Sequence, residues 1–138
     1  MIFLGVDLGS KTLGLSISTS GIIASNLETF RFSDNDYDKA VLYLVDKINE
    51  LGIDEVVIGL PKHMNNDLGV RGQISVDFKE SLEAKVKAKI VLWDERLSTR
   101  TARHALSDQN KKRDKQRRLK DEIAAVVILQ NYLDYLNK

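Results

Sequence analysis

Acidic residues occur at three places where a predicted core element ends or begins. Asp7 closes the apolar stretch "IFLGVD", and Asp94 and Glu95 follow the apolar stretch "KIVLW". Asp121 lies near the start of the last predicted helix. Hard divalent cations such as Mg²⁺ prefer carboxylate oxygens, and two ions about 3.5–4 Å apart can activate a water and stabilise the leaving oxygen of a phosphodiester. The acids therefore predict a metal-dependent hydrolytic site that needs no histidine.

The last predicted helix carries one stripe on which residues recur at i, i+3, i+4 and i+7, namely Asp121, Ala124, Ala125 and Ile128. Two alanines on this stripe suit close packing against a sheet, which would direct Asp121 toward the sheet edge. An unpaired carboxylate there is costly unless a partner or a metal accompanies it. Two alternatives stay open: Asp121 is an exposed first-turn acid favoured by the helix dipole, or Glu122 takes its place.

The segment 96–120 is strongly basic, with ten Lys and Arg residues against two Asp, although the net charge of the whole chain is only +1. A basic block on a nearly neutral protein indicates a polyanion partner, and a phosphate backbone can be bound without reading its sequence. A solvated flexible loop explains the same charges. The residues that we expect to contact phosphate are Lys11, Arg96, Lys111, Lys112, Arg113, Arg117 and Arg118.

The composition excludes several other classes of protein. The 138 residues suffice for one domain, 1–138, with a hydrophobic content of 43% and a charged content of 30%. The absence of cysteine excludes disulfides and thiolate metal sites, and the two histidines match no zinc-binding spacing. No P-loop, nucleophile elbow, signal peptide or membrane span is present, so we expect a cytoplasmic protein.

The hydrophobic pattern predicts an α/β fold. A two-residue turn at Ser20-Gly21 joins the second and third of five predicted strands, 2–7, 14–19, 22–32, 55–61 and 89–93. Helices are predicted over 37–51, 70–87, 99–106 and 118–136, with a basic loop over 107–117. Three antiparallel strands followed by parallel βα units give a mixed five-stranded sheet with helices on both faces. Ligands bind beyond the carboxyl ends of parallel strands in such sheets, where Asp7 and Asp94-Glu95 stand.

Four stretches of the chain carry a more specific signal: "GVDLGSKTLGLSIS", "VVIGLPKHMNNDLGVRG", "LWDERLST" and "KDEIAAVVILQNYLD". In this order and spacing they resemble the YqgF/RuvX family, a bacterial branch of the RNase H-like superfamily that is related to the Holliday-junction resolvase RuvC. The resemblance covers nearly the whole chain and implies an RNase H-like fold.

The resemblance also implies a function, a metal-dependent endonuclease that matures the 5′ end of precursor 16S rRNA in ribosome biogenesis. Asp7, Glu95 and Asp121 match the family's acids and would hold one or two Mg²⁺ or Mn²⁺ ions. Asp94 would orient the region of Glu95. The implied partners are structured precursor rRNA and the precursor of the small ribosomal subunit, without a membrane.

Three alternative functions remain. A resolvase of four-way DNA junctions would act as a symmetric dimer, with the apolar last helix as one source of an interface, so both a monomer and a homodimer are considered. A non-catalytic RNA- or ribosome-associated factor would keep the fold without the chemistry. An ATP-binding module of the actin or sugar-kinase type is disfavoured, because such proteins close two domains of this size around the nucleotide.

Overall fold

The computed structural model describes residues 1–60, 69–94 and 113–137, except the side chains of Asp94 and of residues 113–122. One five-stranded sheet forms its centre, with the strand order β3-β2-β1-β4-β5. The strands are β1 Phe3–Leu8, β2 Thr12–Ser18, β3 Ser25–Arg31, β4 Glu55–Leu60 and β5 Lys89–Asp94. β1, β2 and β3 are antiparallel to one another, whereas β4 and β5 run parallel to β1. The predicted mixed sheet is therefore confirmed.

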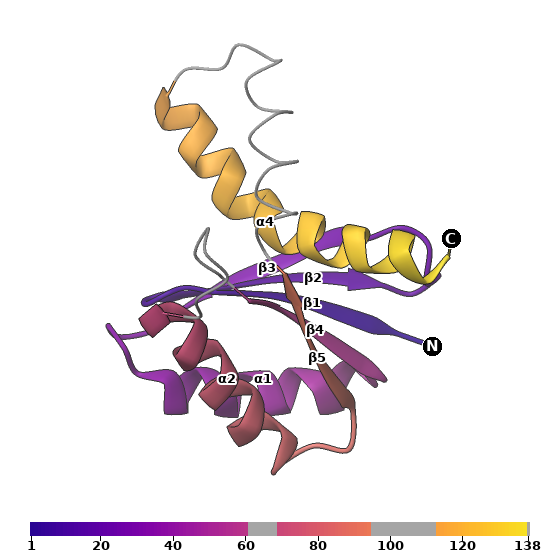
Figure 1. The fold of residues 1–138 in the computed structure, drawn as a ribbon, viewed down its shortest axis with the longest axis horizontal. Helices are drawn as coiled ribbons and strands as arrows, with labels where there is room; N and C mark the ends of the chain where they lie inside the picture. The colour runs from indigo at the N-terminus through magenta and orange to yellow at the C-terminus, as the bar shows by residue number, and fades with distance from the viewer. Residues whose placement is uncertain (61–68, 95–112, 138) are drawn as a thin grey trace.

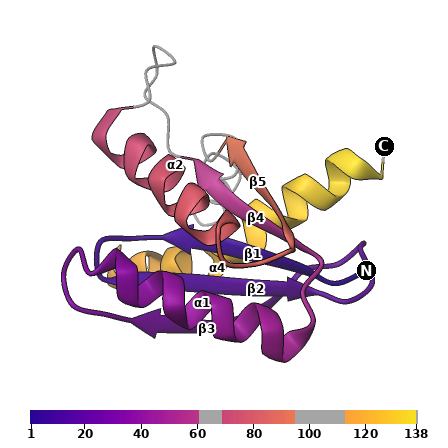
Figure 2. The same ribbon diagram turned by 90° about the horizontal axis from the view of Figure 1, so that it is seen from below.

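Helices cover both faces of this sheet, as predicted (Figure 1). α1 Tyr37–Leu51 and α2 Gly69–Glu83 lie on one face, and α4 Arg113–Leu136 lies across the other. The view turned by 90°, from below, shows α1 in front of β2 and β3, with α2 closer to β4 and β5 (Figure 2). The amino-terminal half of α4 extends past the sheet, while its carboxyl-terminal half packs on it.

Strand alternation divides the core into two apolar layers. In β1, Leu4, Val6 and Leu8 are buried in the layer with α1 and α2. Phe3 is buried on the opposite face, in a cluster with the part of α4 that includes Leu129. All residues of β4 are buried, as expected for a central parallel strand covered on both faces.

The structure corrects several predicted boundaries. β2 begins at Thr12 instead of residue 14, α2 ends at Glu83 instead of residue 87, and α4 begins at Arg113 instead of residue 118. The stretch 113–117 was predicted as loop because it has no apolar residue, yet its Arg, Lys and Gln residues are good helix formers. The predicted helix 99–106 and the loop residues 107–112 lie outside the described part of the chain.

The predicted two-residue turn between β2 and β3 is wrong, since the connection spans residues 19–24. The side chain of Gln130 on α4 explains this length. It accepts a hydrogen bond from the Ala24 amide and donates one to the Ile22 carbonyl, each at 2.8 Å. These backbone groups therefore bond to the helix and leave the β2–β3 ladder.

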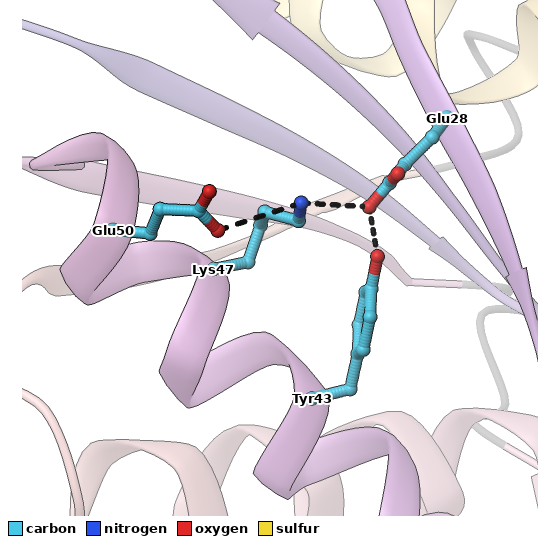
Figure 3. A network of polar contacts seen from close by, with 4 residues as sticks. All are labelled: Glu28, Tyr43, Lys47 and Glu50. Atoms are coloured by element: carbon cyan, nitrogen blue, oxygen red, sulfur yellow. Dashed lines mark hydrogen bonds and ion pairs between the residues drawn. The ribbon is translucent and has the colours of Figure 1, made fainter.

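A polar network ties α1 to the edge strand β3 (Figure 3). The Tyr43 hydroxyl donates a hydrogen bond to the Glu28 carboxylate, and the Lys47 ammonium lies 3.2 Å from the same carboxylate oxygen. The Tyr43 ring also stacks on Phe30 with ring centroids 3.8 Å apart. The hydrogen bond from Tyr43 lowers the pKa of Glu28, with a further contribution from Lys47.

This network predicts an acid-dependent stability. Because the pKa of Glu28 is lowered on folding, its contribution is present above its unfolded pKa, near 4.5, and is lost as pH falls through the lower folded value. The stability difference between the wild type and Glu28→Gln, measured by urea unfolding from pH 7 to pH 3, should therefore shrink below pH 4.5. Tyr43→Phe keeps the ring stack and removes the donor, so its acid dependence should be weaker than that of the wild type. A stability difference between the wild type and Glu28→Gln that stays the same from pH 7 to pH 3 would contradict the role assigned to Glu28.

Candidate functional site

Asp7 lies at the carboxyl end of β1, on the face that α4 covers. It is the penultimate residue of the strand, is half-buried, and stands opposite Gly14 in β2. Alternation from Phe3 and Gly5, both of which face α4, places Asp7 on that face. The structure thus puts the first predicted acid at the sheet edge where the parallel strands end.

The second acidic position belongs to the same edge. β5 ends at Asp94, which pairs in register with Leu60 at the end of β4. Because β1, β4 and β5 run parallel, their carboxyl ends lie along one edge of the sheet. Glu95 follows Asp94 directly in the chain and lies outside the described residues.

α4 approaches the sheet most closely at Gly5. A Cβ atom on Gly5 would overlap Ser16 Oγ, and would lie 2.7 Å from Leu129 Cβ and 2.8 Å from the Ala125 carbonyl oxygen. Ser16, opposite Gly5 in the ladder, donates a buried hydrogen bond of 2.7 Å from its hydroxyl to that same carbonyl. Only a glycine in β1 leaves room for the helix backbone here.

This contact orients α4 relative to Asp7. Of the stripe predicted to pack on the sheet, Ala125 and Ile128 are fully buried, whereas Ala124 is half-buried. The last turns of the helix reach the β2–β3 connection, where Asn137 donates a hydrogen bond of 2.9 Å from its side chain to the Gly21 carbonyl. α4 therefore runs antiparallel to β1, and its turns before Ala125, which include Asp121, follow toward the Asp7 end of the strand.

A second contact holds α4 at the opposite edge of the sheet. The Tyr132 hydroxyl donates a hydrogen bond to the carboxylate of Glu55, which is buried at the start of β4. Burial, and then the bond to Glu55, raise the pKa of Tyr132. The Trp93 ring lies 5.3 Å from that of Tyr132, edge to face, and 5.3 Å from that of Tyr135. These contacts fix the helix to β4 and β5.

The turn between β1 and β2 presents Lys11 at the edge that holds Asp7. Its backbone is held by three hydrogen bonds, from the Gly9 amide to the Thr12 carbonyl at 2.8 Å, from the Asn35 amide to the Ser10 carbonyl at 2.8 Å, and from the Phe32 amide to the Lys11 carbonyl at 2.9 Å. The Lys11 side chain is exposed. The predicted phosphate contact thus sits on a well-bonded turn.

Sequence reasoning missed Arg71. From the first turn of α2, its guanidinium donates hydrogen bonds to the Leu8 carbonyl at 3.0 Å and to the Tyr37 hydroxyl at 3.1 Å. An arginine two residues after a helix-starting glycine, downstream of a core strand, was the available signal. It gave no indication that the side chain reaches β1.

Most of the remaining site predictions fall where the structure gives no side-chain placement. Glu95, Arg96, Lys111 and Lys112 lie outside the described residues. Arg113, Arg117, Arg118 and Asp121 belong to α4, but only their backbone is described. Among the described side chains, no group of three or more His, Cys, Asp or Glu could hold a metal ion. Within the same ranges, no helix has the length and apolar character of a membrane span.

Comparisons with known proteins identify the family of this chain. A family model described as "RuvX: Holliday junction resolvase" matches residues 1–135. A relative in Onion yellows phytoplasma is 52% identical over 134 residues, covering 96% of this chain and 89% of that protein. One in Staphylococcus aureus is 46% identical over 136 residues, covering 97% and 96%. Both are named "Putative pre-16S rRNA nuclease".

A solved structure shows the same fold. RuvC of T. thermophilus in complex with a Holliday junction substrate matches with a TM-score of 0.67 at 12% sequence identity, covering 99% of this chain and 95% of that one. RuvC has an RNase H-like fold, so the expected fold class is confirmed.

The close approach at Gly5 predicts a strong steric effect. Gly5→Ala should lower the free energy of unfolding by about 1–3 kcal/mol, because the added methyl group overlaps the helix and Ser16. Ser16→Ala removes the nearest of the overlapping atoms, so the double variant should lose less stability than the sum of the two single losses. Urea unfolding of the four proteins measures this coupling. Strict additivity, or a Gly5→Ala protein of wild-type stability, would contradict the packing.

The Tyr132–Glu55 contact predicts an alkaline limit. Tyr132→Phe should lose about 1–3 kcal/mol at pH 7, because the buried carboxylate loses its donor. The raised pKa of Tyr132 means that its contribution is present below its unfolded pKa, about 10, and is lost as pH rises through the higher folded value. The stability gap between the wild type and Tyr132→Phe should therefore narrow above pH 10 in urea unfolding. Glu55→Gln keeps an acceptor and removes the charge, so its alkaline slope should be shallower than that of the wild type; an equal slope would contradict the role of Glu55.

Proposed function

We propose that this chain, which belongs to the RuvX family, is a metal-dependent endonuclease that processes the 5′ end of precursor 16S rRNA in the cytoplasm. The observation that carries the proposal is the position of Asp7 at the carboxyl ends of the parallel strands, on the face beneath α4. β5 ends at that same edge, immediately before Glu95, and α4 runs toward it with Asp121. The proposed substrate is the one given in the names of the relatives.

Asp7, Glu95 and Asp121 would hold one or two Mg²⁺ or Mn²⁺ ions. Their chemistry fits such ions, because all three offer carboxylate oxygens, and the sequence has no cysteine to supply a thiolate. A bound ion would supply Lewis-acid stabilisation of the charge that develops on the phosphodiester oxygens during attack by water. Asp94, adjacent in sequence, would orient the Glu95 region.

The chain's own cations would hold the substrate backbone. Lys11 lies on the turn that directly follows β1, and its side chain is exposed. It would therefore contact a phosphate bound near Asp7. Arg96 and the basic residues from Lys111 to Arg118 would bind further phosphates without reading sequence. Such binding should weaken as salt concentration rises, because each neutralised phosphate releases counterions.

A four-way DNA junction is the second candidate substrate, and the description of the matching family favours it. The same carboxylates and the same water attack would serve either backbone, so the fold does not separate the two substrates. A junction resolvase would need two sites in one symmetric assembly. A protein that sediments as a monomer at micromolar concentration would therefore count against this candidate.

Substitution of Asp7 tests the catalytic assignment. Loss of a residue that only orients a metal ligand lowers activity by about 10–100-fold. Asp7 is proposed as a ligand itself, so Asp7→Asn should reduce Mg²⁺-dependent cleavage by at least about 100-fold. Asp54→Asn is the matched control, since Asp54 lies just before β4 at the opposite edge of the sheet, where it accepts a hydrogen bond of 2.7 Å from the Ile2 amide. It should cleave as the wild type does. Circular dichroism would verify both folds.

The assay offers precursor 16S rRNA and a four-way DNA junction side by side, with Mg²⁺ or Mn²⁺. Cleavage of the RNA that Asp7→Asn abolishes supports the proposal. Cleavage of the junction alone replaces it with the second candidate. RNA binding without cleavage by the wild type would indicate a non-catalytic RNA-associated factor, and activity retained in Asp7→Asn would refute the metal assignment.

A further inference from the structure

We propose that Arg71 is a positioning residue for the candidate site, because it holds the backbone between Asp7 and Lys11 through the Leu8 carbonyl. Its contribution to cleavage rests on the proposed function, whereas its effect on the backbone follows from the fold alone. Arg71 comes from α2, on the sheet face opposite α4. It therefore acts on β1 from the side where sequence reasoning placed no site residue.

The hydrogen-bond pattern of β1 explains why Leu8 needs such a partner. β1 pairs with β2 as far as Leu8 opposite Leu13, but its register with β4 ends at Val6 opposite Ile58. The Gly9 amide bonds on the β2 side, to Thr12. Since the backbone groups of successive strand residues point to opposite sides, those of Leu8 point to the β4 side, beyond the last registered pair. The Arg71 guanidinium donates to the Leu8 carbonyl on this side, at 3.0 Å.

Because Leu8 is buried, the hydrogen bond from Arg71 to its carbonyl matters for stability. Leu8 is 8% exposed, and a buried carbonyl without a donor costs about 1–3 kcal/mol. A charged donor makes the bond stronger than a neutral one would be. Within the described ranges, no carboxylate lies within 4.0 Å of the Arg71 guanidinium.

A chain of hydrogen bonds orients the guanidinium and returns to the same turn. Arg71 donates to the Tyr37 hydroxyl at 3.1 Å, and that hydroxyl donates to the Asn35 side chain at 3.1 Å. The Asn35 amide in turn donates to the Ser10 carbonyl at 2.8 Å. The turn that carries Lys11 is thus linked at both Leu8 and Ser10 to the starts of α1 and α2.

Direct contact with a substrate phosphate is the competing role. The guanidinium has five N–H donors, of which the bonds to Leu8 and Tyr37 use two. The two roles differ in their kinetics. A phosphate contact would act on substrate binding and its salt dependence, whereas a positioning residue would act on kcat and on the free protein.

Amide hydrogen exchange in the absence of substrate tests the positioning directly. In Arg71→Met, the amides of residues 9–12 should exchange roughly tenfold or more faster than in the wild type, because a hydrogen bond to a charged group contributes about 1.5–3 kcal/mol. The amide of Val57, in the buried centre of β4, should keep its protection. Lys79→Met is the matched control, since it removes a positive charge from the same helix but breaks only the 3.0 Å ion pair with Glu83. It should leave residues 9–12 unchanged.

Cleavage kinetics complete the test. Arg71→Met should lower kcat roughly tenfold with KM within about twofold, and Arg71→Lys should restore part of kcat, because an ammonium can replace one of the two bonds. Unchanged exchange at residues 9–12 would overturn the proposal. A raised KM with unchanged kcat and a weaker salt dependence would also overturn it, in favour of a phosphate contact. If the wild type cleaves neither substrate, the proposed function fails, and hydrogen exchange alone still decides the role of Arg71.

Discussion

The arrangement of this protein depends on the close approach of α4 to the sheet at Gly5. A side chain at that position would collide with Leu129, the Ala125 carbonyl and Ser16, so the helix could not lie directly on β1. The Ser16 hydroxyl turns the same approach into a specific contact by donating to the Ala125 carbonyl. The space left by Gly5 and one buried hydrogen bond thus fix both the distance of α4 from the sheet and its position along β1. Any residue of α4 that reaches the carboxyl edge depends on this contact for its position.

The two edges of the sheet are organised differently. At the amino edge, side chains bond to one another and to backbone groups: Tyr132 to Glu55, Gln130 to the β2–β3 connection, and Asn137 to Gly21. These contacts hold the carboxyl-terminal half of α4 firmly. The carboxyl edge instead carries Asp7, the end of β5 and the exposed Lys11. At the amino edge the described bonds hold α4, whereas at the carboxyl edge they hold the turn between β1 and β2.

Much of this fold could be predicted from sequence because its signals are local. Apolar runs and helical periodicity identified the core elements, and the two alanines of the last helix indicated its close packing. Two of the errors arose where a distant side chain decides local structure. Gln130, more than 100 residues away, sets the length of the β2–β3 connection. Arg71 was missed for the same reason, since its bond to Leu8 spans 63 positions. The side-chain positions of Glu95 and Asp121 stay predictions.

Asp7 is bracketed by two constraints that come from opposite faces of the sheet. Two residues before it, Gly5 lies against α4, and one residue after it, the Leu8 carbonyl bonds to Arg71 of α2. Among the described residues, β1 has no registered β4 partner beyond Val6, so its last two residues pair in the sheet with β2 alone. The hydrogen bond from Arg71 of α2 to the Leu8 carbonyl adds support from the sheet face opposite the one toward which Asp7 is directed. A strand end that is supported from the α2 face in this way can hold a carboxylate at a fixed position on the α4 face.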